Sequence, residues 1–308
     1  MEDRELKIVP PEYIVIRPPV EGASRSVLIP VTGGCSWNRC IFCGTYKGMY
    51  GIIQNYGIRP IEEVLRDIDY YVEHNYHGYP VFLAGGNPTS APTDYLVEII
   101  KYIRAKLKNV QRVSCYAKAL DILRKSDVEL KKIAEAGLDI VYMGLESGSS
   151  KILRIMKKGT NAESMIKAGK RVLKAGIKLS VYIILGLGGK KFSKEHIIET
   201  ARVLTEINPT IFRFRTLNIV PFSKLWNDWR NGEFELLSPV ENLKEEREII
   251  ANLGDNVTSQ VFNDHMSNYC SIETPNIKLD REMFIKTLDH FINDPRIQNM
   301  QRTNLTHM

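Results

Sequence analysis

Three cysteines lie close together in the sequence and form its clearest chemical feature. Cys35, Cys40 and Cys43 are spaced C-x4-C-x2-C and follow a pair of glycines at 33–34. Thiolates this close together on one loop are typical ligands of a soft metal ion or of an iron–sulfur cluster. The spacing therefore indicates a metal centre.

Three interpretations of this cysteine group are open: an iron–sulfur cluster, a zinc site, and buried free thiols. A structural zinc site takes four ligands, and the nearest histidines, His74 and His77, lack the usual paired spacing. Three thiolates on a four-iron cluster leave one iron open to a small molecule. The remaining cysteines, Cys115 and Cys270, have no partner spacing, and we expect each to be a small buried residue.

Glycines and one carboxylate follow the predicted strands. Gly85 and Gly86 come directly after an apolar run, and Glu146 follows a second one. In β/α folds the carboxyl ends of the strands carry the chemistry, and glycine there allows a ligand to approach the backbone closely. Glu146 either contacts a polar ligand or forms a structural ion pair. Further glycines in such positions are at 33–34, 148 and 186–189.

Polar side chains also alternate along two predicted strands. Ser180 and Tyr182 are two residues apart, as are Arg213 and Arg215, so each pair lies on one face of its strand. We expect Ser180 and Tyr182 to contact a nucleoside or a substrate. Buried arginines are costly unless paired, so Arg213 and Arg215 bind an anionic substrate or cofactor carboxylate, or pair with an acid such as Glu146.

A dense polar group occurs late in the sequence, at His265, Asn268 and Tyr269, with Asp264 beside the histidine. If this segment folds over the site, His265 and Tyr269 are candidates for substrate binding or for proton transfer. The alternative is a histidine at the surface with no role in the chemistry.

Six short apolar runs alternate with amphipathic segments of helical period, which predicts a parallel sheet with right-handed crossovers. An open doubly wound sheet and an incomplete barrel both satisfy this pattern, and the glycines after the strands favour the barrel. We therefore expect an α/β fold, an incomplete (β/α)6 TIM-like barrel with a C-terminal capping segment. The expected parts are an N-terminal arm (1–24), the core (25–220) and the cap (221–308). The predicted strands are 26–32, 81–84, 112–117, 140–145, 179–185 and 211–219, and the later predicted helices are 93–107, 127–136, 162–175, 194–207, 240–253 and 281–292.

Composition restricts the class of protein further. Of the 308 residues, 44% are hydrophobic and 25% are charged, which suits a folded protein with a large core. The net charge of +6 is mild and evenly spread, so it does not indicate DNA binding. The sequence has no apolar run long enough to cross a bilayer, and its charged start does not resemble a signal peptide. We expect a cytoplasmic protein without a transmembrane segment.

The cysteine triad followed by six βα units resembles the radical S-adenosylmethionine (SAM) superfamily over about residues 25–220. The usual spacing in that family is C-x3-C-x2-C, and this chain has one residue more. The pattern is most similar to the branch of the elongator catalytic subunit and the coproporphyrinogen-dehydrogenase-like proteins. This likeness rests on three segments: Gly144 to Gly148, Lys157 to Thr160, and Gly186 to Gly189. Two further segments, Cys35 to Asn38 and His265 to Tyr269, are typical of a smaller group within the branch.

The resemblance implies one [4Fe-4S] cluster on the three cysteines, with S-adenosyl-L-methionine at the fourth iron. It implies that Phe42 packs near the adenine, and that Gly85, Gly86 and Asn87 receive the SAM amino group. Asn87 stands where the family usually has an acidic residue. The resemblance also places Glu146 and Ser147 near the ribose and carboxylate, and Gly186 at the adenine.

The implied activity is reductive cleavage of SAM to a 5′-deoxyadenosyl radical, which abstracts hydrogen from a small-molecule or lipid-like substrate. A one-electron donor such as flavodoxin or ferredoxin is implied as partner. Two leftover cysteines are too few for a second cluster, which argues against sulfur insertion. We expect no room for a separate cobalamin, acetyltransferase or RNA-binding domain. The alternatives are a haem-binding carrier and an RNA-modifying radical enzyme.

Overall fold

The computed structural model describes residues 26–48, 53–221 and 223–300. The expected N-terminal arm, 1–24, lies outside the described residues. The chain forms two compact units. The first unit contains the described residues up to 38, residues 45–143 and 171–178, and the second contains 39–44, 144–170 and the described residues from 179 onward.

The sheet of the first unit consists of short parallel strands in chain order. They are β1 (Val27–Pro30), β4 (Val81–Ala84), β5 (Val113–Ala117) and β6 (Ile140–Glu146), and each pairs in parallel with the next. Their apolar residues are almost entirely buried, which is typical of parallel strands covered on both faces. A separate two-stranded ribbon joins β2 (Thr32–Gly33) to β3 (Gly57–Ile58).

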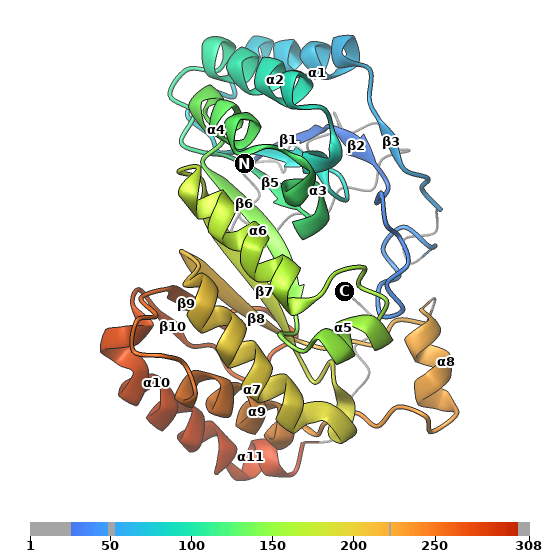
Figure 1. The fold of residues 1–308 in the computed structure, drawn as a ribbon, viewed down its shortest axis with the longest axis vertical. Helices are drawn as coiled ribbons and strands as arrows, with labels where there is room; N and C mark the ends of the chain where they lie inside the picture. Colours follow the sequence, from blue (N-terminus) through green and yellow to red (C-terminus); the bar gives the residue numbers. More distant parts are fainter. Residues whose placement is uncertain (1–25, 49–52, 222, 301–308) are drawn as a thin grey trace. The chain divides into compact units, whose positions relative to one another are not determined.

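Three helices of the first unit pack in sequence: α1 (Ile61–Glu73) against α2 (Thr93–Lys106), and α2 against α4 (Asp127–Ala136), as Figure 1 shows. The ends of α4 illustrate why the sequence predicted it correctly. Ser126 and Glu129 form a reciprocal capping box at its start. Gly137 ends it with a φ of 111°, which glycine adopts readily. The shorter helix α3 (Ala119–Arg124) and a 3-10 turn (Pro88–Ser90) complete this unit.

The second unit continues the alternation but adds strands from the C-terminal part. β7 (Lys178–Leu185), β8 (Ile211–Thr216) and β9 (Gln260–Phe262) are parallel, and β10 (Glu273–Thr274) is antiparallel to β9. β9 and β10 fall in the expected capping segment, so part of this segment extends the sheet. The hydroxyl of Ser259 donates to the carbonyl of Pro209 at 2.5 Å and helps to hold β9 beside β8.

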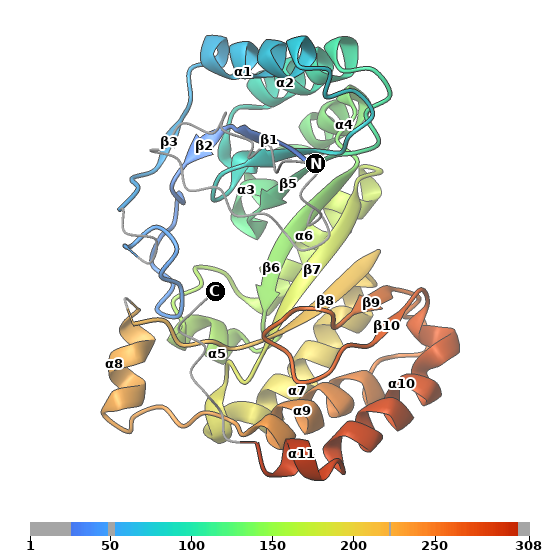
Figure 2. The ribbon, with the colours of Figure 1, turned by 180° about the vertical axis from the view of Figure 1, so that it is seen from behind.

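Three helices of the second unit, α7, α9 and α10, lie side by side (Figures 1 and 2). α9 contains Glu245 and Glu246, both fully buried. The helices with residues in this unit are α5 (Ser150–Ile155), α6 (Ala162–Lys174), α7 (Gly189–Ile207), α8 (Lys224–Arg230), α9 (Pro239–Ala251), α10 (Ile277–Ile292) and α11 (Pro295–Gln298).

The structure confirms the predicted fold class: a mostly parallel α/β arrangement in which each unit keeps its parallel strands in chain order. In the described residues the sheet does not close into a complete barrel. α7 begins at Gly189 rather than near residue 194, and α10 begins at Ile277, where Asn276 caps it, rather than near 281. The short helices α3, α5 and α8 were not predicted, because six or seven residues are too few to show a helical period.

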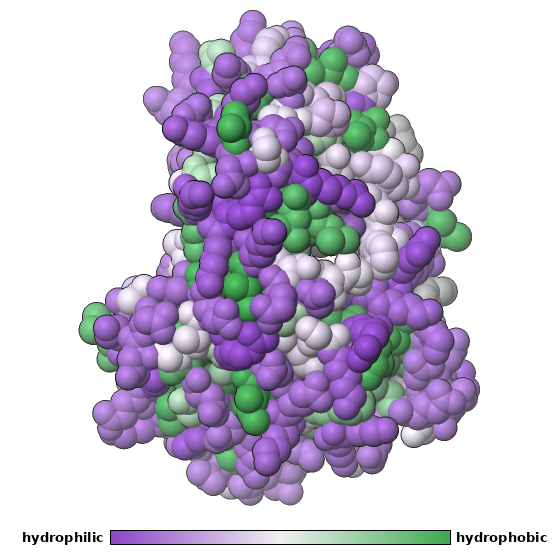
Figure 3. Space-filling model, in the orientation of Figure 1, coloured by the Kyte–Doolittle hydropathy of each residue, from purple (hydrophilic) through white to green (hydrophobic). Residues whose placement is uncertain are grey.

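No helix among the described residues is long and apolar enough to span a membrane. Figure 3 shows a face on which hydrophilic residues predominate and hydrophobic residues occur in small groups. Single exposed residues such as Met266 and Leu279 are normal on protein surfaces.

Glu246 is a buried acid that has no cation partner within the part of the chain that the structure describes. Both of its carboxylate oxygens accept from Asn263 Nδ2, at 2.8 and 2.7 Å. Burial raises the pKa of Glu246 to about 8 from an ordinary value of 4.5. The folded chain therefore keeps a proton that the unfolded chain loses near pH 4.5, so the free energy of unfolding falls as pH rises from about 4.5 to about 8.

We predict that Glu246→Gln makes the chain more stable than the parent at pH 9, by about 2–4 kcal/mol, and changes stability little at pH 5. The glutamine amide keeps the shape of the neutral acid. The side-chain oxygen of Asn263, Oδ1, lacks a hydrogen bond in the described structure and can accept one from this amide. The measurement is urea unfolding at both pH values. Glu248→Gln, on the more exposed face of α9, is the control and should show no such difference. An equal effect of Glu246→Gln at both pH values would contradict a neutral, buried Glu246.

Candidate functional site

The three loop cysteines differ from the other two cysteines in their surroundings. Cys35, Cys40 and Cys43 are partly exposed, whereas Cys115 and Cys270 are free and buried, as predicted. Burial raises the pKa of the Cys115 thiol to about 12 and raises that of Cys270 as well. The loop thiols are therefore the accessible ones.

Cys35 belongs to the first unit, and Cys40 and Cys43 belong to the second. Within the residues that the structure describes, no three His, Cys, Asp or Glu side chains are gathered as in a formed metal site. The donor set itself suits an iron–sulfur cluster, because three partly exposed thiols would hold it and would leave one iron without a protein ligand.

Two glycines after β4 support the start of the cysteine loop. The backbone N–H of Gly86 donates to the carbonyl of Gly34 at 3.0 Å. A Cβ atom on Gly86 would overlap that carbonyl and lie 2.7 Å from Cys35 Cα. Gly85 has a φ of 122°, and a Cβ there would overlap Thr32. Only glycine allows the end of β4 to lie this close to the loop.

Asn87 links the same loop to α3. Its Oδ1 accepts from the backbone N–H of Ser36 at 3.0 Å, and its Nδ2 donates to Ser36 Oγ at 2.8 Å and to Asp121 Oδ2 at 2.5 Å. Asn87 and Asp121 are both buried. The other oxygen of Asp121 has no hydrogen bond in the described part of the chain, and Arg124 lies 4.0 Å from it. Sequence reasoning missed Asp121 because it lies in a helix that was not predicted.

In the second unit, Ile41 anchors the segment between Cys40 and Cys43. Its N–H donates to the carbonyl of Met156 at 3.1 Å, and its carbonyl accepts from the N–H of Leu225 at 3.0 Å. Ile41 also belongs to a buried apolar cluster, against which Phe42 packs. A cavity of about 170 Å³ lies beside this cluster, bordered by Ile41, Ile152, Leu187, Phe192 and Phe234.

Glu146 ends β6 in an uncommon backbone conformation, with a φ of 63°. A residue other than glycine rarely adopts this region, and such strain persists only where the surroundings enforce it. Its carboxylate accepts a hydrogen bond from Lys158 Nζ at 2.6 Å, and both side chains are mostly buried. A Cβ on Gly144 would overlap the carboxylate of Glu146 and crowd Lys158, so glycine leaves room for the pair. The structure shows this ion pair for Glu146, and the expected contact with a polar ligand stays a prediction.

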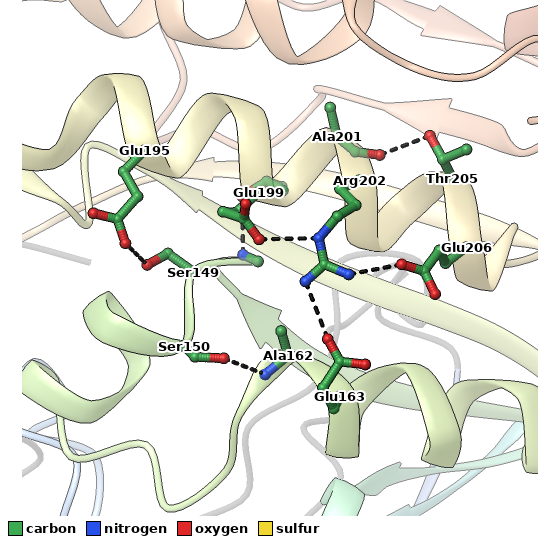
Figure 4. Close-up of polar contacts among 12 residues, drawn as sticks. Ser149, Ser150, Ala162, Glu163, Glu195, Glu199, Ala201, Arg202, Thr205 and Glu206 are labelled. Carbon is green, nitrogen blue, oxygen red and sulfur yellow. Dashed lines mark hydrogen bonds and ion pairs between the residues drawn. The ribbon is translucent and has the colours of Figure 1, made fainter.

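The segment after β6 is held by α7 and by the first residue of α6, as Figure 4 shows for Ser149 and Ser150. Ser149 Oγ donates to the carboxylate of Glu195 at 2.5 Å, and Ser150 Oγ accepts from the N–H of Ala162. The N–H of Gly148 donates to Thr200 Oγ1 at 2.9 Å. This glycine has no room for a side chain, because a Cβ would overlap the α7 backbone. The conformation after β6 is thus set by hydrogen bonds to two helices, α6 and α7.

A buried polar network joins the ends of β6 and β7 to two helices. Glu245 on α9 accepts from the N–H of Gly186 at 2.5 Å and from Ser193 Oγ. His196 Nδ1 lies 2.8 Å from Ser147 Oγ, and its Nε2 lies 3.6 Å from Glu245. Burial lowers the pKa of His196 to about 3 and raises that of Glu245 to about 7, so the histidine is neutral.

Sequence reasoning missed both His196 and Glu245. A polar residue within an amphipathic helix is ordinarily assigned to the exposed face, and only the tertiary packing shows these two to be buried. A signal for Glu245 does exist, because it and Glu246 occur on a helix with Leu243, Ile249 and Ile250. Two adjacent acids in a helix cannot both lie opposite these apolar side chains.

The structure brings together the polar residues predicted on β7 and β8. Tyr182 and Arg213 are register partners in the parallel pair, and Arg215 lies on the same face. Arg213 donates to Asp264 Oδ1 at 2.8 Å, so its partner is Asp264 and not Glu146. Ser180, on this face of β7, is fully buried, and its hydroxyl lacks a hydrogen bond within the described residues.

The loop that carries His265 and Tyr269 lies against β8. The N–H of Thr216 donates to Ser267 Oγ at 3.2 Å, and Asn268 Nδ2 donates to the carbonyl of Phe214 at 2.9 Å. His265 Nδ1 lies 2.7 Å from Ser267 Oγ. Burial, and then the nearby guanidinium of Arg215, lower the pKa of His265 to about 4. His265 is therefore a partly buried neutral residue beside β8, and Tyr269 is half-buried in the same loop.

Comparison with known proteins agrees with the resemblance seen in the sequence. A family model described as the Radical SAM superfamily matches residues 29–204, more than half of the chain. An uncharacterised protein of Methanocaldococcus jannaschii is 26% identical over 237 residues, which cover 76% of this chain and 68% of that protein. The tRNA uridine(34) acetyltransferase of Methanocaldococcus infernus is 23% identical over 270 residues, 76% of this chain and 50% of that protein. The chain thus spans only half the length of this second relative.

Among solved structures, the archaeal Elp3 of Methanocaldococcus infernus, with an N-terminal deletion, has a similar fold. The TM-score is 0.52 at 14% identity, and the match covers 86% of this chain and 63% of that chain. At this identity the likeness concerns the fold alone.

We predict that Glu146 and Lys158 stabilise the fold as a coupled pair. Glu146→Gln and Lys158→Gln should each lower the free energy of unfolding by about 1–2 kcal/mol, and the double variant should lose about 1 kcal/mol less than the sum. Urea unfolding of the four proteins measures this coupling. The exposed pair Glu282 and Lys286 on α10 provides the control cycle and should show no measurable coupling. Additive effects of Glu146→Gln and Lys158→Gln would contradict the predicted role of the pair.

Proposed function

Because the chain belongs to the radical SAM superfamily, we propose that it cleaves S-adenosylmethionine reductively at a [4Fe-4S] cluster held by Cys35, Cys40 and Cys43. The family uses this cluster and SAM as cofactors, and the chain is a radical SAM enzyme. The observation that supports the ligand assignment is the set of three partly exposed thiols in one loop within the matched residues.

When bound, the cluster supplies one electron to the sulfonium of SAM, whose carbon–sulfur bond breaks to give methionine and a 5′-deoxyadenosyl radical. The protein's part is to bind, orient and exclude water. Gly85 and Gly86 would offer backbone groups to SAM without a side chain in the way. Phe42, packed against the apolar cluster of the second unit, would contact the adenine.

The acid that binds the SAM ammonium group is Asp121 in this proposal, acting beside Asn87. The family usually has an acidic residue at the position of Asn87. Asp121 contacts Asn87, and its Oδ1 is a buried acceptor without a hydrogen bond in the described structure. A buried carboxylate oxygen of this kind is a suitable partner for an ammonium group. Asn87 itself would orient Asp121 and the loop after Cys35.

In the second unit, Glu146, Ser147 and Gly186 would contact the ribose, the carboxylate and the adenine. Their support is the network that holds them: Lys158 for Glu146, His196 for Ser147, and Glu245 for Gly186. The proposed contacts on the β7–β8 face are Ser180, Tyr182 and Arg213, and those in the following loop, for substrate binding or proton transfer, are His265 and Tyr269.

The proposed reaction is hydrogen abstraction from a small-molecule or lipid-like substrate. A one-electron donor such as flavodoxin or ferredoxin would reduce the cluster. We place the protein in the cytoplasm, where cysteines remain reduced.

A second candidate function is modification of RNA. It is favoured by one observation, the match to a protein named as a tRNA uridine(34) acetyltransferase, of which this chain spans half. Binding of RNA through phosphates would weaken steeply with salt.

We predict that the anaerobically reconstituted chain contains four irons and forms 5′-deoxyadenosine from SAM and dithionite. Cys40→Ala should lose most of the cluster and all of the cleavage, because two thiolates hold a four-iron cluster poorly. Cys115→Ala is the matched control and should keep both. Iron and sulfide analysis and chromatography of the nucleoside are the measurements.

Several outcomes of this assay separate the candidates. Stimulation of deoxyadenosine formation by tRNA, together with salt-sensitive RNA binding, would favour the RNA-modifying enzyme. An intact cluster that never cleaves SAM, combined with tight haem binding, would favour a haem carrier. A Cys40→Ala variant with a full cluster would disprove the ligand assignment.

We predict that Asp121→Asn weakens SAM binding to the reconstituted chain about tenfold, because it removes the charge that faces the ammonium group. Equilibrium dialysis with labelled SAM measures this. Asp127→Asn is the control, since Asp127 is an exposed acid of the same unit paired with Arg171. If both variants bind SAM as the parent does, the ammonium group is held elsewhere.

A further inference from the structure

Two arginines extend from one face of β8 in the second unit. Arg213 and Arg215 are two residues apart on this strand, and the neighbouring strand β7 places Tyr182 on the same face. The opposite face of both strands carries no charged side chain, and Val181 and Phe212 are buried there. The positive charge of the strand is therefore gathered on one side.

Aromatic rings hold both guanidinium groups. That of Arg213 lies 4.0 Å from the ring centre of Phe262, and that of Arg215 lies 4.7 Å from the ring centre of Tyr182. Such contacts fix a guanidinium through its flat face. The N–H groups lie in the plane at its edge, so they remain available as hydrogen-bond donors.

The two arginines differ in their charge partners. Arg213 forms an ion pair with Asp264. Arg215 forms no ion pair or hydrogen bond with the residues that the structure describes, and its Nε is a buried donor without an acceptor. His265, in the loop beside them, is neutral and adds no negative charge. Burial and both arginines lower its pKa. The face thus keeps one unbalanced positive charge.

A half-buried guanidinium without a counter-charge is unfavourable unless a ligand supplies the charge. The edge of a guanidinium forms two parallel hydrogen bonds with a carboxylate or a phosphate, and this geometry is the strongest that arginine makes. Because Arg215 is already held against Tyr182, its side chain would lose less conformational entropy when such a ligand binds.

We propose that Arg215 binds an anionic group of the substrate, a carboxylate or a phosphate, while the pair of Arg213 and Asp264 shapes the neighbouring surface. This inference rests on the proposed function, because it assumes that the protein acts on a substrate. The residues that carry it lie apart in sequence from the cysteine loop. It narrows the small-molecule or lipid-like substrate to one that carries an oxyanion.

SAM also has a carboxylate, which is the alternative anionic ligand for Arg215. The test therefore measures two affinities of the anaerobically reconstituted chain by calorimetry at constant ionic strength. One is the dissociation constant of a simple anion, with acetate, succinate and inorganic phosphate as the probes. The other is the dissociation constant of SAM, measured with and without the probe.

We expect at least one probe to bind, and to bind equally well when SAM is present. Arg215→Gln should raise its dissociation constant at least tenfold and leave that of SAM within twofold. Arg215→Lys, which keeps the charge but loses the two-pronged donor edge, should have an intermediate effect. Arg154→Gln, at an exposed position on α5, is the matched control and should change neither constant.

Two results would overturn the proposal. The first is that no probe binds the parent, or that Arg215→Gln and Arg215→Lys bind it as the parent does. The second is that the probes compete with SAM and that Arg215→Gln weakens SAM binding, which would assign Arg215 to the cofactor. Failure of the parent to form deoxyadenosine, with probe binding intact and dependent on Arg215, would disprove the proposed function and leave the anion site standing.

Discussion

The candidate site depends on one constraint: polar groups at the ends of buried strands need partners, because water does not reach them. After β4, the buried side chain of Asn87 has its hydrogen-bond partners in the N–H of Ser36 and in Asp121. After β7, the N–H of Gly186 is satisfied by Glu245, from a helix about sixty residues further along the chain. Side chains remote in sequence thus determine the conformation of each strand end. The predicted motifs contain only some of the residues that form these networks.

The same constraint explains the division between neutral and charged buried groups. Glu245 and Glu246 lie in apolar surroundings with amide, hydroxyl and N–H donors, and burial raises the pKa of both. An arginine side chain has no comparable way to become neutral, because a guanidinium keeps its charge in proteins. A buried acid can become neutral by holding a proton, whereas a buried arginine keeps its charge and needs an anion beside it. This difference is why the β8 face, and not α9, suggests a ligand.

Much of the fold could be predicted from the sequence because its signals are local. The capping box at Ser126 and the left-handed Gly137 define α4 within a few residues, and the apolar runs locate the parallel strands. The short α3 gave no such signal, so Asp121 was missed. The burial of His196 and Glu245 is a property of helix packing, which a periodic pattern does not show. The pairing of β9 with β8 joins segments about fifty residues apart, and no local sequence pattern predicts this pairing.

The hydrogen bond between Glu245 and Gly186 has a consequence for how this architecture can change in evolution. The acceptor for a strand-end N–H comes from the segment after residue 220, the part of the chain expected only to cover the core. That segment is therefore not a module that recombination could exchange freely. A replacement would have to bring its own acceptor to Gly186 and its own partner for Ser193. Diversification of the C-terminal part should thus proceed by substitution around a retained helix, rather than by substitution of the whole segment.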